Sequence, residues 1–109
     1  MPKTPAETPI PPHAIMMPLL FGKQLTASLA ALARLGVADH MDADFTPVEV
    51  LAEKVEAHAP SLFRVMRMLA AMGVFREGPG HTFALTPVGE LLRTEAPGSM
   101  RYSAIMLGD

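Results

Sequence analysis

The sequence contains no cysteine among its 109 residues, which excludes disulfide bonds and thiolate chemistry. It shows no signal peptide either, since the N-terminus is rich in proline and has no apolar central stretch. The longest apolar stretch, residues 18–35, is interrupted by polar and charged side chains and does not predict a membrane span. We therefore expect a cytoplasmic protein that does not insert into a membrane.

Positive charge is not in excess. Nine Lys and Arg residues stand against eleven Asp and Glu residues, for a formal net charge of -2. Nucleic acids and anionic membranes attract strongly basic surfaces. Neither is expected as a partner.

The motifs of a self-contained enzyme are missing as well. No GxGxxG or P-loop sequence is present, so we expect this chain to bind no cofactor. The four histidines lack metal-ligand spacing, and no cysteine supplements them. We therefore expect no catalytic, cofactor-binding or metal-binding residue. One dense polar cluster is interpreted as a solvated acidic loop, and it comprises Asp39, His40, Asp42 and Asp44.

Apolar residues, in contrast, are abundant. They make up 50% of the sequence, nine residues are methionine, and the mean hydropathy is +0.26. A small domain must cover much of its surface with polar groups, so this excess indicates that some apolar surface meets a partner. Most of the methionines are expected in the core, where flexible side chains fill irregular gaps.

The N-terminal region divides into a flexible proline-rich arm, residues 1–13, and a long helix over residues 15–35. Pro18 is expected in the first turn of that helix or between a short leading turn and the main helix. Leucines recur at helical spacing and alanines occupy the other faces, so the helix is apolar nearly all round. One side is expected to face the domain's own core and the other a second subunit. Gly36 is the expected C-terminal cap.

Two helices are predicted in the middle of the chain. After a short helix at residues 37–41, Thr46 is expected to cap a helix that has Pro47 at its first position and Glu49 completing a capping box. A second helix covers residues 60–73. The residues expected to be buried along the two helices are Val48, Leu51, Ala52, Val55, Leu62, Val65, Met66, Leu69 and Ala70.

A β-hairpin is predicted next. Residues 74–76 and 82–85 have strand-like composition, and residues 78–81 have the composition of a turn. A helix-turn-helix followed by a hairpin makes a winged helix, with the hairpin as its wing.

The C-terminal part is predicted to be helical again. Thr86 is expected to cap a helix that Pro87 opens and that continues to about Leu92. A last helix opens at residues 97–99. The expected fold is a mainly α-helical winged-helix domain over residues 14–109.

A winged helix most often indicates DNA binding. Over residues 46–83, however, four basic residues are balanced by four acidic ones, and the turn at residues 78–81 has no lysine or arginine. The second helix offers only Arg64 and Arg67 for contact with DNA. A homodimeric winged-helix transcription regulator is therefore kept as an alternative function.

Four segments occur in order along the chain: LAALARLGVADHM, HAPSLFRVMRMLAAMGVF, FALTPVGELLRTEAPGSMR and SAIMLGD. Their combination resembles the N-terminal domain of the bacterial and plant-type O-methyltransferases, which act on hydroxyls of phenolic and polyketide metabolites. The resemblance covers residues 14–109. It implies that the domain intertwines with a second copy in a homodimer. It also implies that whole enzymes continue into a Rossmann-like domain, which binds S-adenosylmethionine and holds the catalytic histidine.

The resemblance further implies where this chain meets its substrate and its partner. The last helix would line the acceptor pocket with Met106 and Leu107. The first helix of one subunit would reach the partner's pocket with Met16 or Phe21. For each of these four residues, ordinary packing in the core or interface is the alternative. Burial in the dimer is expected mainly from Leu19, Leu20, Phe21, Leu25, Leu29 and Leu32.

The expected function is homodimerisation within an S-adenosylmethionine-dependent O-methyltransferase. The chain would contribute to the pocket for a small-molecule acceptor and would not be catalytic alone. A stand-alone interaction subunit is kept as an alternative beside the transcription regulator.

Overall fold

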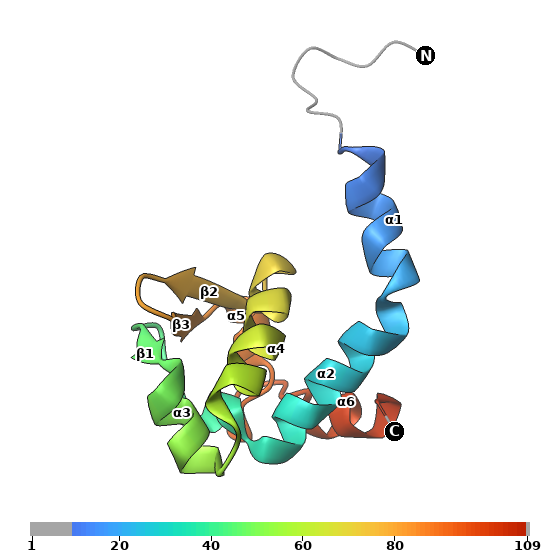
Figure 1. The fold of residues 1–109 in the computed structure, drawn as a ribbon. Coiled ribbons are helices and arrows are strands. Elements are labelled where there is room, and N and C mark those ends of the chain that lie inside the picture. The colour runs from blue at the N-terminus through green and yellow to red at the C-terminus, as the bar shows by residue number, and fades with distance from the viewer. Residues whose placement is uncertain (1–9, 109) are drawn as a thin grey trace.

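The computed structural model describes residues 10–108, which form helices around one small sheet (Figure 1). The mainly helical fold with a small β-hairpin is confirmed. In chain order the elements are α1 (Pro12–Leu20), α2 (Gly22–Leu35), the 3-10 helix η1 (Val37–His40), β1 (Thr46–Pro47), α3 (Val48–Val55), α4 (Ala59–Ala71), β2 (Phe75–Gly78), β3 (Thr82–Leu85), α5 (Pro87–Glu90) and α6 (Arg101–Leu107).

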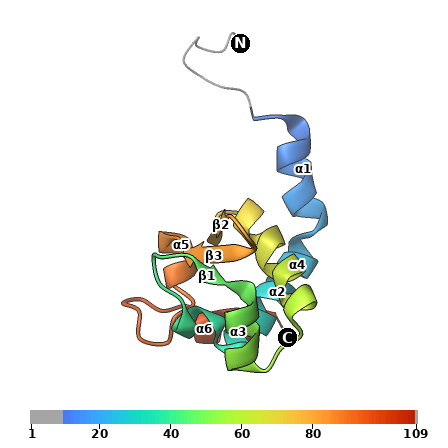
Figure 2. The same cartoon turned by 60° about the vertical axis from the view of Figure 1, so that its left-hand side comes forward.

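The N-terminal helix, predicted as one, is two. The helices α1 and α2 meet at Phe21 with an angle of 63° between them. Pro18 inside α1 has no N–H to donate, and Gly22 has a weak helix preference, so the backbone bends here at little cost. The helix begins at Pro12 rather than at residue 15; residues 1–9 of the predicted arm lie outside the described part. In Figures 1 and 2, α1 extends away from all other elements.

The core lies where α3, α4, the sheet and the last turns of α2 meet. Phe75 and Phe83 from the sheet, Leu51 from α3 and Met66 from α4 are almost fully buried in it. Burial of such side chains stabilises the fold by about 1.5–3 kcal/mol each. In α2 the buried residues begin only at Ala30, and α1 buries none. The first helix and a half therefore add no fully buried side chain to the protomer's core.

The core stripes predicted for the two middle helices largely agree with the structure. Val48, Leu51, Ala52, Leu62, Met66 and Leu69 are buried, whereas Val55, Val65 and Ala70 are half-buried at the edge of the core.

The sheet has a strand that was not predicted. Its antiparallel order is β1-β3-β2, with Thr46 opposite Phe83. Thr46 is therefore a strand residue, and the predicted capping box is wrong: α3 begins at Val48 and has no side-chain cap. The Val48 N–H instead donates to the carbonyl of His81 at 2.9 Å. The hydrogen bond to the hairpin therefore gives a partner to a free N–H at the start of α3, as the Thr46 hydroxyl was expected to do.

The C-terminal elements are shorter than predicted. Thr86 caps α5 as predicted, since its hydroxyl oxygen accepts from the N–H of Gly89 at 3.2 Å. The helix nevertheless ends at Glu90, and α6 begins only at Arg101. Between them the chain forms a loop, closed by a 2.7 Å hydrogen bond from the N–H of Met100 to the carbonyl of Leu91.

Candidate functional site

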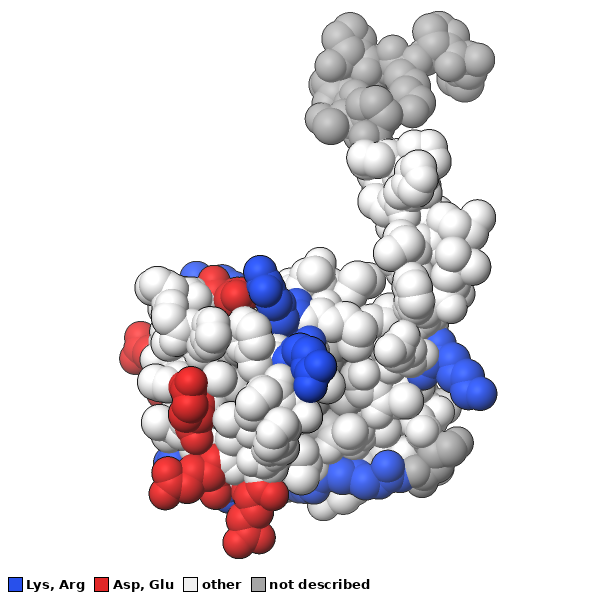
Figure 3. Space-filling model, in the orientation of Figure 1, with Lys and Arg blue, Asp and Glu red and all other residues white. Residues whose placement is uncertain are grey.

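The helix α1 presents a continuous apolar surface to solvent. It contains no Lys, Arg, Asp or Glu, and Leu19 and Leu20 are 72% and 68% exposed. Figure 3 shows α1 without acidic or basic side chains on the face in view. No single helix within residues 10–108 is long and apolar enough to span a membrane, although the bent pair α1–α2 reaches the required length and composition. So much exposed apolar surface on a small domain indicates a binding surface.

A groove lies where α1 bends into α2. Its volume is about 380 Å³, and α4 forms the opposite wall with Met68 and Met72. Met17 and Phe21 approach from the side of the bend. Flexible methionine side chains adapt to different partner shapes, so this groove can be filled without strain. Its lining residues are Met17, Pro18, Phe21, Gln24, Leu25, Met68, Ala71 and Met72.

A second apolar cavity of about 270 Å³ lies between α2, α5 and α6. Leu107 from α6, Leu29 from α2 and Val88 from α5 contribute to its wall. The hydroxyl of Thr26 also lies in the wall, but it donates to the carbonyl of Gly22 in its own helix. The cavity therefore suits an apolar group more than a polar one.

The two exposed residues that were predicted to face the acceptor lie on α6. Met106 and Leu107 are 75% and 76% exposed, and Leu107 alone of the two lines the second cavity. Met16 lies in α1, and Phe21 lies between α1 and the N-terminal end of α2. Within one protomer, Phe21 lines the groove at the bend and Leu107 lines the second cavity, so these two residues do not share a cavity.

The six residues predicted for the dimer interface divide into three groups. Leu19, Leu20 and Phe21 are exposed, whereas Leu25 and Leu29 are half-buried against the protomer's own core. Leu32 is 3% exposed and lies within that core. Its apolar surface is covered by the chain it belongs to, so the predicted interface role is not supported by exposure in the protomer.

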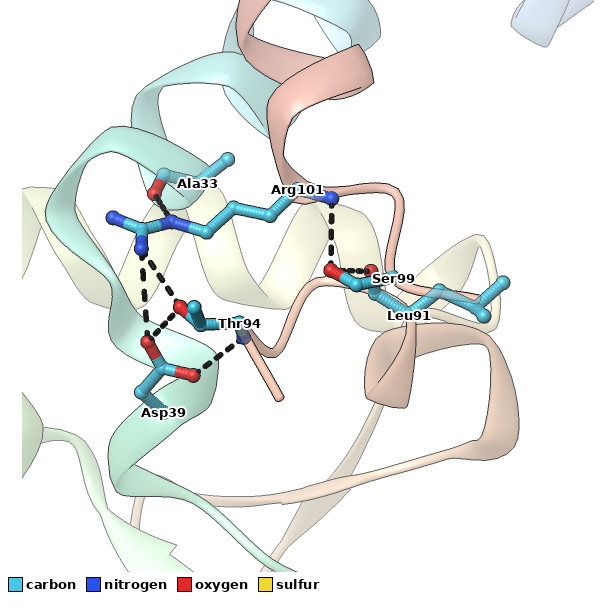
Figure 4. Close-up of polar contacts among 6 residues, drawn as sticks. All are labelled: Ala33, Asp39, Leu91, Thr94, Ser99 and Arg101. Carbon is cyan, nitrogen blue, oxygen red and sulfur yellow. Dashed lines mark hydrogen bonds and ion pairs between the residues drawn. The ribbon is translucent and has the colours of Figure 1, made fainter. Parts of the chain in front are cut away.

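A polar cluster joins α6 to the end of α2 (Figure 4). The Arg101 side chain donates from Nε to the carbonyl of Ala33 at 2.7 Å and from Nη1 to Oγ1 of Thr94 at 2.8 Å. The carboxylate of Asp39 accepts from the N–H of Thr94 at 2.8 Å and from its hydroxyl at 2.7 Å. Arg101 Nη1 and Asp39 Oδ2 are 3.9 Å apart.

This cluster perturbs the acid at its centre. Burial alone would raise the pKa of Asp39, but the hydrogen bonds from Thr94 and the charges of Arg101 and Arg93 outweigh burial. Together they lower the pKa below its ordinary value of 3.8. Asp39 was predicted to belong to a solvated loop, and Arg101 was not singled out. The two lie far apart in sequence, so no local pattern could have revealed the cluster.

Two arginines near the hairpin, Arg67 and Arg76, contact neighbouring groups of the protein. Arg67 Nε lies 3.5 Å from the carboxylate of Glu77. Arg76 donates to the carbonyl of Ala43 at 3.1 Å and lies over the ring of Phe45. Among residues 10–108, no group of three or more His, Asp or Glu side chains is arranged to hold a metal ion.

Residues 17–95 match the family model described as the O-methyltransferase dimerisation domain. The chain is 42% identical over 100 residues to phenazine O-methyltransferase PhzM of Lysobacter antibioticus. The matched region covers 92% of this chain and 29% of that protein. The crystal structure of LaPhzM superposes with a TM-score of 0.81 at 42% identity and covers 92% of this chain and 30% of that one.

A second solved structure, the calicheamicin methyltransferase CalO1 with S-adenosylhomocysteine bound, gives a TM-score of 0.76 at 34% identity. It covers 93% of this chain and 31% of that chain. This chain thus spans under a third of the length of the relatives it matches.

Proposed function

The chain belongs to the O-methyltransferase dimerisation domain family, and from this premise we propose that it pairs two copies of an S-adenosylmethionine-dependent methyltransferase of small molecules. The observation that carries the proposal is the apolar surface of α1. Ile15, Met16, Met17, Leu19 and Leu20 all stand about half-exposed or more. Water is a poor solvent for such a helix, and a second copy of the chain would cover it.

The energy available from this surface is sufficient for a dimer. Full burial of a large apolar side chain contributes about 1.5–3 kcal/mol. Association costs on the order of 4–15 kcal/mol in lost freedom. Each protomer contributes the same residues in a two-fold arrangement, so a few such side chains per subunit offset the cost.

The acceptor-facing role is part of the same proposal. Met106 and Leu107 are exposed at the end of α6, and Leu107 borders an apolar cavity. Met16 and Phe21 belong to the part of the chain that reaches away from its own body. In a pair of copies, these residues would approach the other copy's α6 and line one side of an apolar acceptor pocket.

The cofactor is assigned to the rest of the whole protein. In Rossmann-like folds, a strand, a glycine-rich loop and a helix form the site for an adenosine-containing cofactor. In the described residues, β1 enters α3 directly with no glycine between them, so these residues do not fit such a cofactor. The methyl donor's reactive chemistry therefore lies outside this domain.

Measuring the mass in solution tests the proposal. Light scattering of the chain over a range of concentrations should give twice the mass of one protomer. A single-protomer mass at every concentration would overturn the assignment of α1 as a homodimer surface.

A further inference from the structure

The helix α6 packs along α2 but inserts no side chain deeply into the core. None of its residues is fully buried, and Met106 and Leu107 are among the most exposed large apolar side chains of the described chain. It packs along α2 through small groups: a side chain at Gly108 would overlap the Cβ of Ala30. Small groups permit a close approach of the two helix backbones.

Arg101 is the first residue of α6 and contacts groups from each neighbouring segment. Its Nε reaches Ala33 in α2, and its Nη1 reaches Thr94 in the preceding loop and lies near Asp39 in η1. The side chain is only 20% exposed. A guanidinium group is planar and its donors have fixed directions, so two hydrogen bonds define its orientation.

The contact with Ala33 has an electrostatic component as well. The Ala33 carbonyl belongs to the last turn of α2, where carbonyl groups lack the regular helical partner, and it accepts from the capping Gly36 N–H at 3.2 Å as well as from Arg101. The negative end of the helix dipole also lies there, and it attracts a cation. The direction of α2 and the start of α6 are thus tied to the same side chain.

We propose that Arg101 is a positioning residue whose guanidinium group fixes the direction in which α6 crosses α2, and hence where Met106 and Leu107 are presented. That these two residues meet the acceptor rests on the proposed function. The fixed direction of α6 does not depend on it.

The chemistry distinguishes arginine from lysine at this position. A lysine ammonium group is a single nitrogen and would retain the attraction to Asp39. It cannot supply donors from two separate nitrogens to Ala33 and Thr94. Arg101→Lys should therefore restore only part of the order that Arg101→Gln removes.

The absence of cysteine from the sequence allows a direct distance measurement. Spin labels are attached to Met106→Cys on α6 and Glu53→Cys on α3, and the protein is diluted with unlabelled chain so that only distances within one protomer are recorded. Pulsed electron–electron double resonance then gives the distribution of distances between the two labels. The variants are Arg101→Gln and Arg101→Lys, and the control is Arg64→Gln, which removes the same charge from an exposed position of α4. Thermal melting confirms that each variant is folded.

The expected result is a narrow distribution in the parent and in Arg64→Gln, a broad or shifted one in Arg101→Gln, and an intermediate one in Arg101→Lys. An unchanged distribution in Arg101→Gln, or equal broadening in Arg64→Gln, would overturn the proposal. If Arg101→Gln does not fold, Thr94→Val removes one of its partners instead. Thr94→Val must then broaden the distribution of distances between the two labels, and an unchanged width counts against the proposal. A monomeric parent would remove the proposed function and leave this distance test intact.

Discussion

Arg101 donates a 2.7 Å hydrogen bond from its Nε to the carbonyl oxygen of Ala33, so the first residue of α6 contacts the last turn of α2. Helix ends normally satisfy their carbonyls with nearby residues or water. Here Gly36 is the cap, and its N–H reaches the Ala33 carbonyl at 3.2 Å; Arg101 adds a second donor from far along the chain. The end of one helix and the start of another are thereby held by the same bond.

The Asp39 cluster gives the domain an acid-sensitive contact. Because the pKa of Asp39 is lowered below 3.8 in the folded chain, its contribution to stability is complete above that pH and is lost as the pH falls through the lowered value. The chain has one tyrosine and no tryptophan, so its intrinsic fluorescence reports on Tyr102 beside Arg101. We expect this fluorescence to change below pH 3.8 before the helical circular dichroism is lost. In Asp39→Asn the early change should be missing; an identical titration in that variant contradicts the assignment.

A charge on α1 should separate the two copies. Leu20→Glu places a carboxylate on a residue that is 68% exposed in the protomer, so folding should survive. In the dimer the same carboxylate would be desolvated. We therefore expect the dissociation constant of the dimer to rise by about tenfold to a hundredfold. Sedimentation equilibrium measures this change. Leu29→Glu is less informative, because Leu29 also packs against the protomer's core.

The matched control for that experiment is Val50→Glu on α3. Val50 is 39% exposed and lies on the opposite side of the fold from α1. This variant should sediment as the parent does. Equal weakening of the dimer by both substitutions would show that α1 is not the specific contact.

Gly89 has a steric role in the fold. A Cβ at this position would overlap the carbonyl oxygen of Val74, which belongs to the backbone and cannot easily move. Gly89→Ala should therefore lower the free energy of unfolding by about 1–3 kcal/mol, as overpacking does. Urea denaturation followed by circular dichroism gives the value. Gly22→Ala meets no atom within 4 Å and is the control; an equal loss in both would point to a general effect of alanine.

Binding of the acceptor should depend on the end of α6. Under the proposed function, Leu107→Ala in the whole protein would remove apolar contact with the acceptor and leave the reacting groups in place. We expect the acceptor KM to rise by about tenfold with a smaller change in kcat. Steady-state kinetics with Val50→Ala as the control tests this. An unchanged KM would assign Leu107 to packing alone.

Duplex DNA should not bind the chain. Acidic side chains gather at the end of the molecule formed by α3, next to α4 (Figure 3). Arg67 on α4 already pairs with Glu77. Fluorescence anisotropy with a labelled duplex should therefore show no binding even at low salt. Salt-dependent binding would instead favour a transcription regulator.

Local patterns predicted the elements whose determinants are close together in sequence. The hairpin follows from turn residues between two strand-like segments. The Thr86 hydroxyl oxygen accepts from the N–H of Gly89, which is only three residues further along the chain. The same reasoning was wrong at Thr46, where a strand distant in sequence competes for the backbone. Helix periodicity also did not place the bend at Phe21, because leucine and alanine continue on both sides of it.

The candidate site was predictable only in part. The excess of apolar residues indicated a partner surface, and the exposed residues of α1 agree with that indication. Sequence alone could not show that Leu32 is buried in the core while Leu20 is exposed, because both continue the same helical pattern. The Arg101 cluster depends on three segments meeting, which only the folded chain reveals.

The 63° bend between α1 and α2 has a thermodynamic consequence. It directs α1 away from the apolar core that the described residues form, so in a single folded copy that helix stays exposed to solvent. If a second copy supplies the cover, unfolding and dissociation become one coupled equilibrium. The melting temperature is then a property of the solution as well as of the sequence, and it rises with protein concentration by mass action.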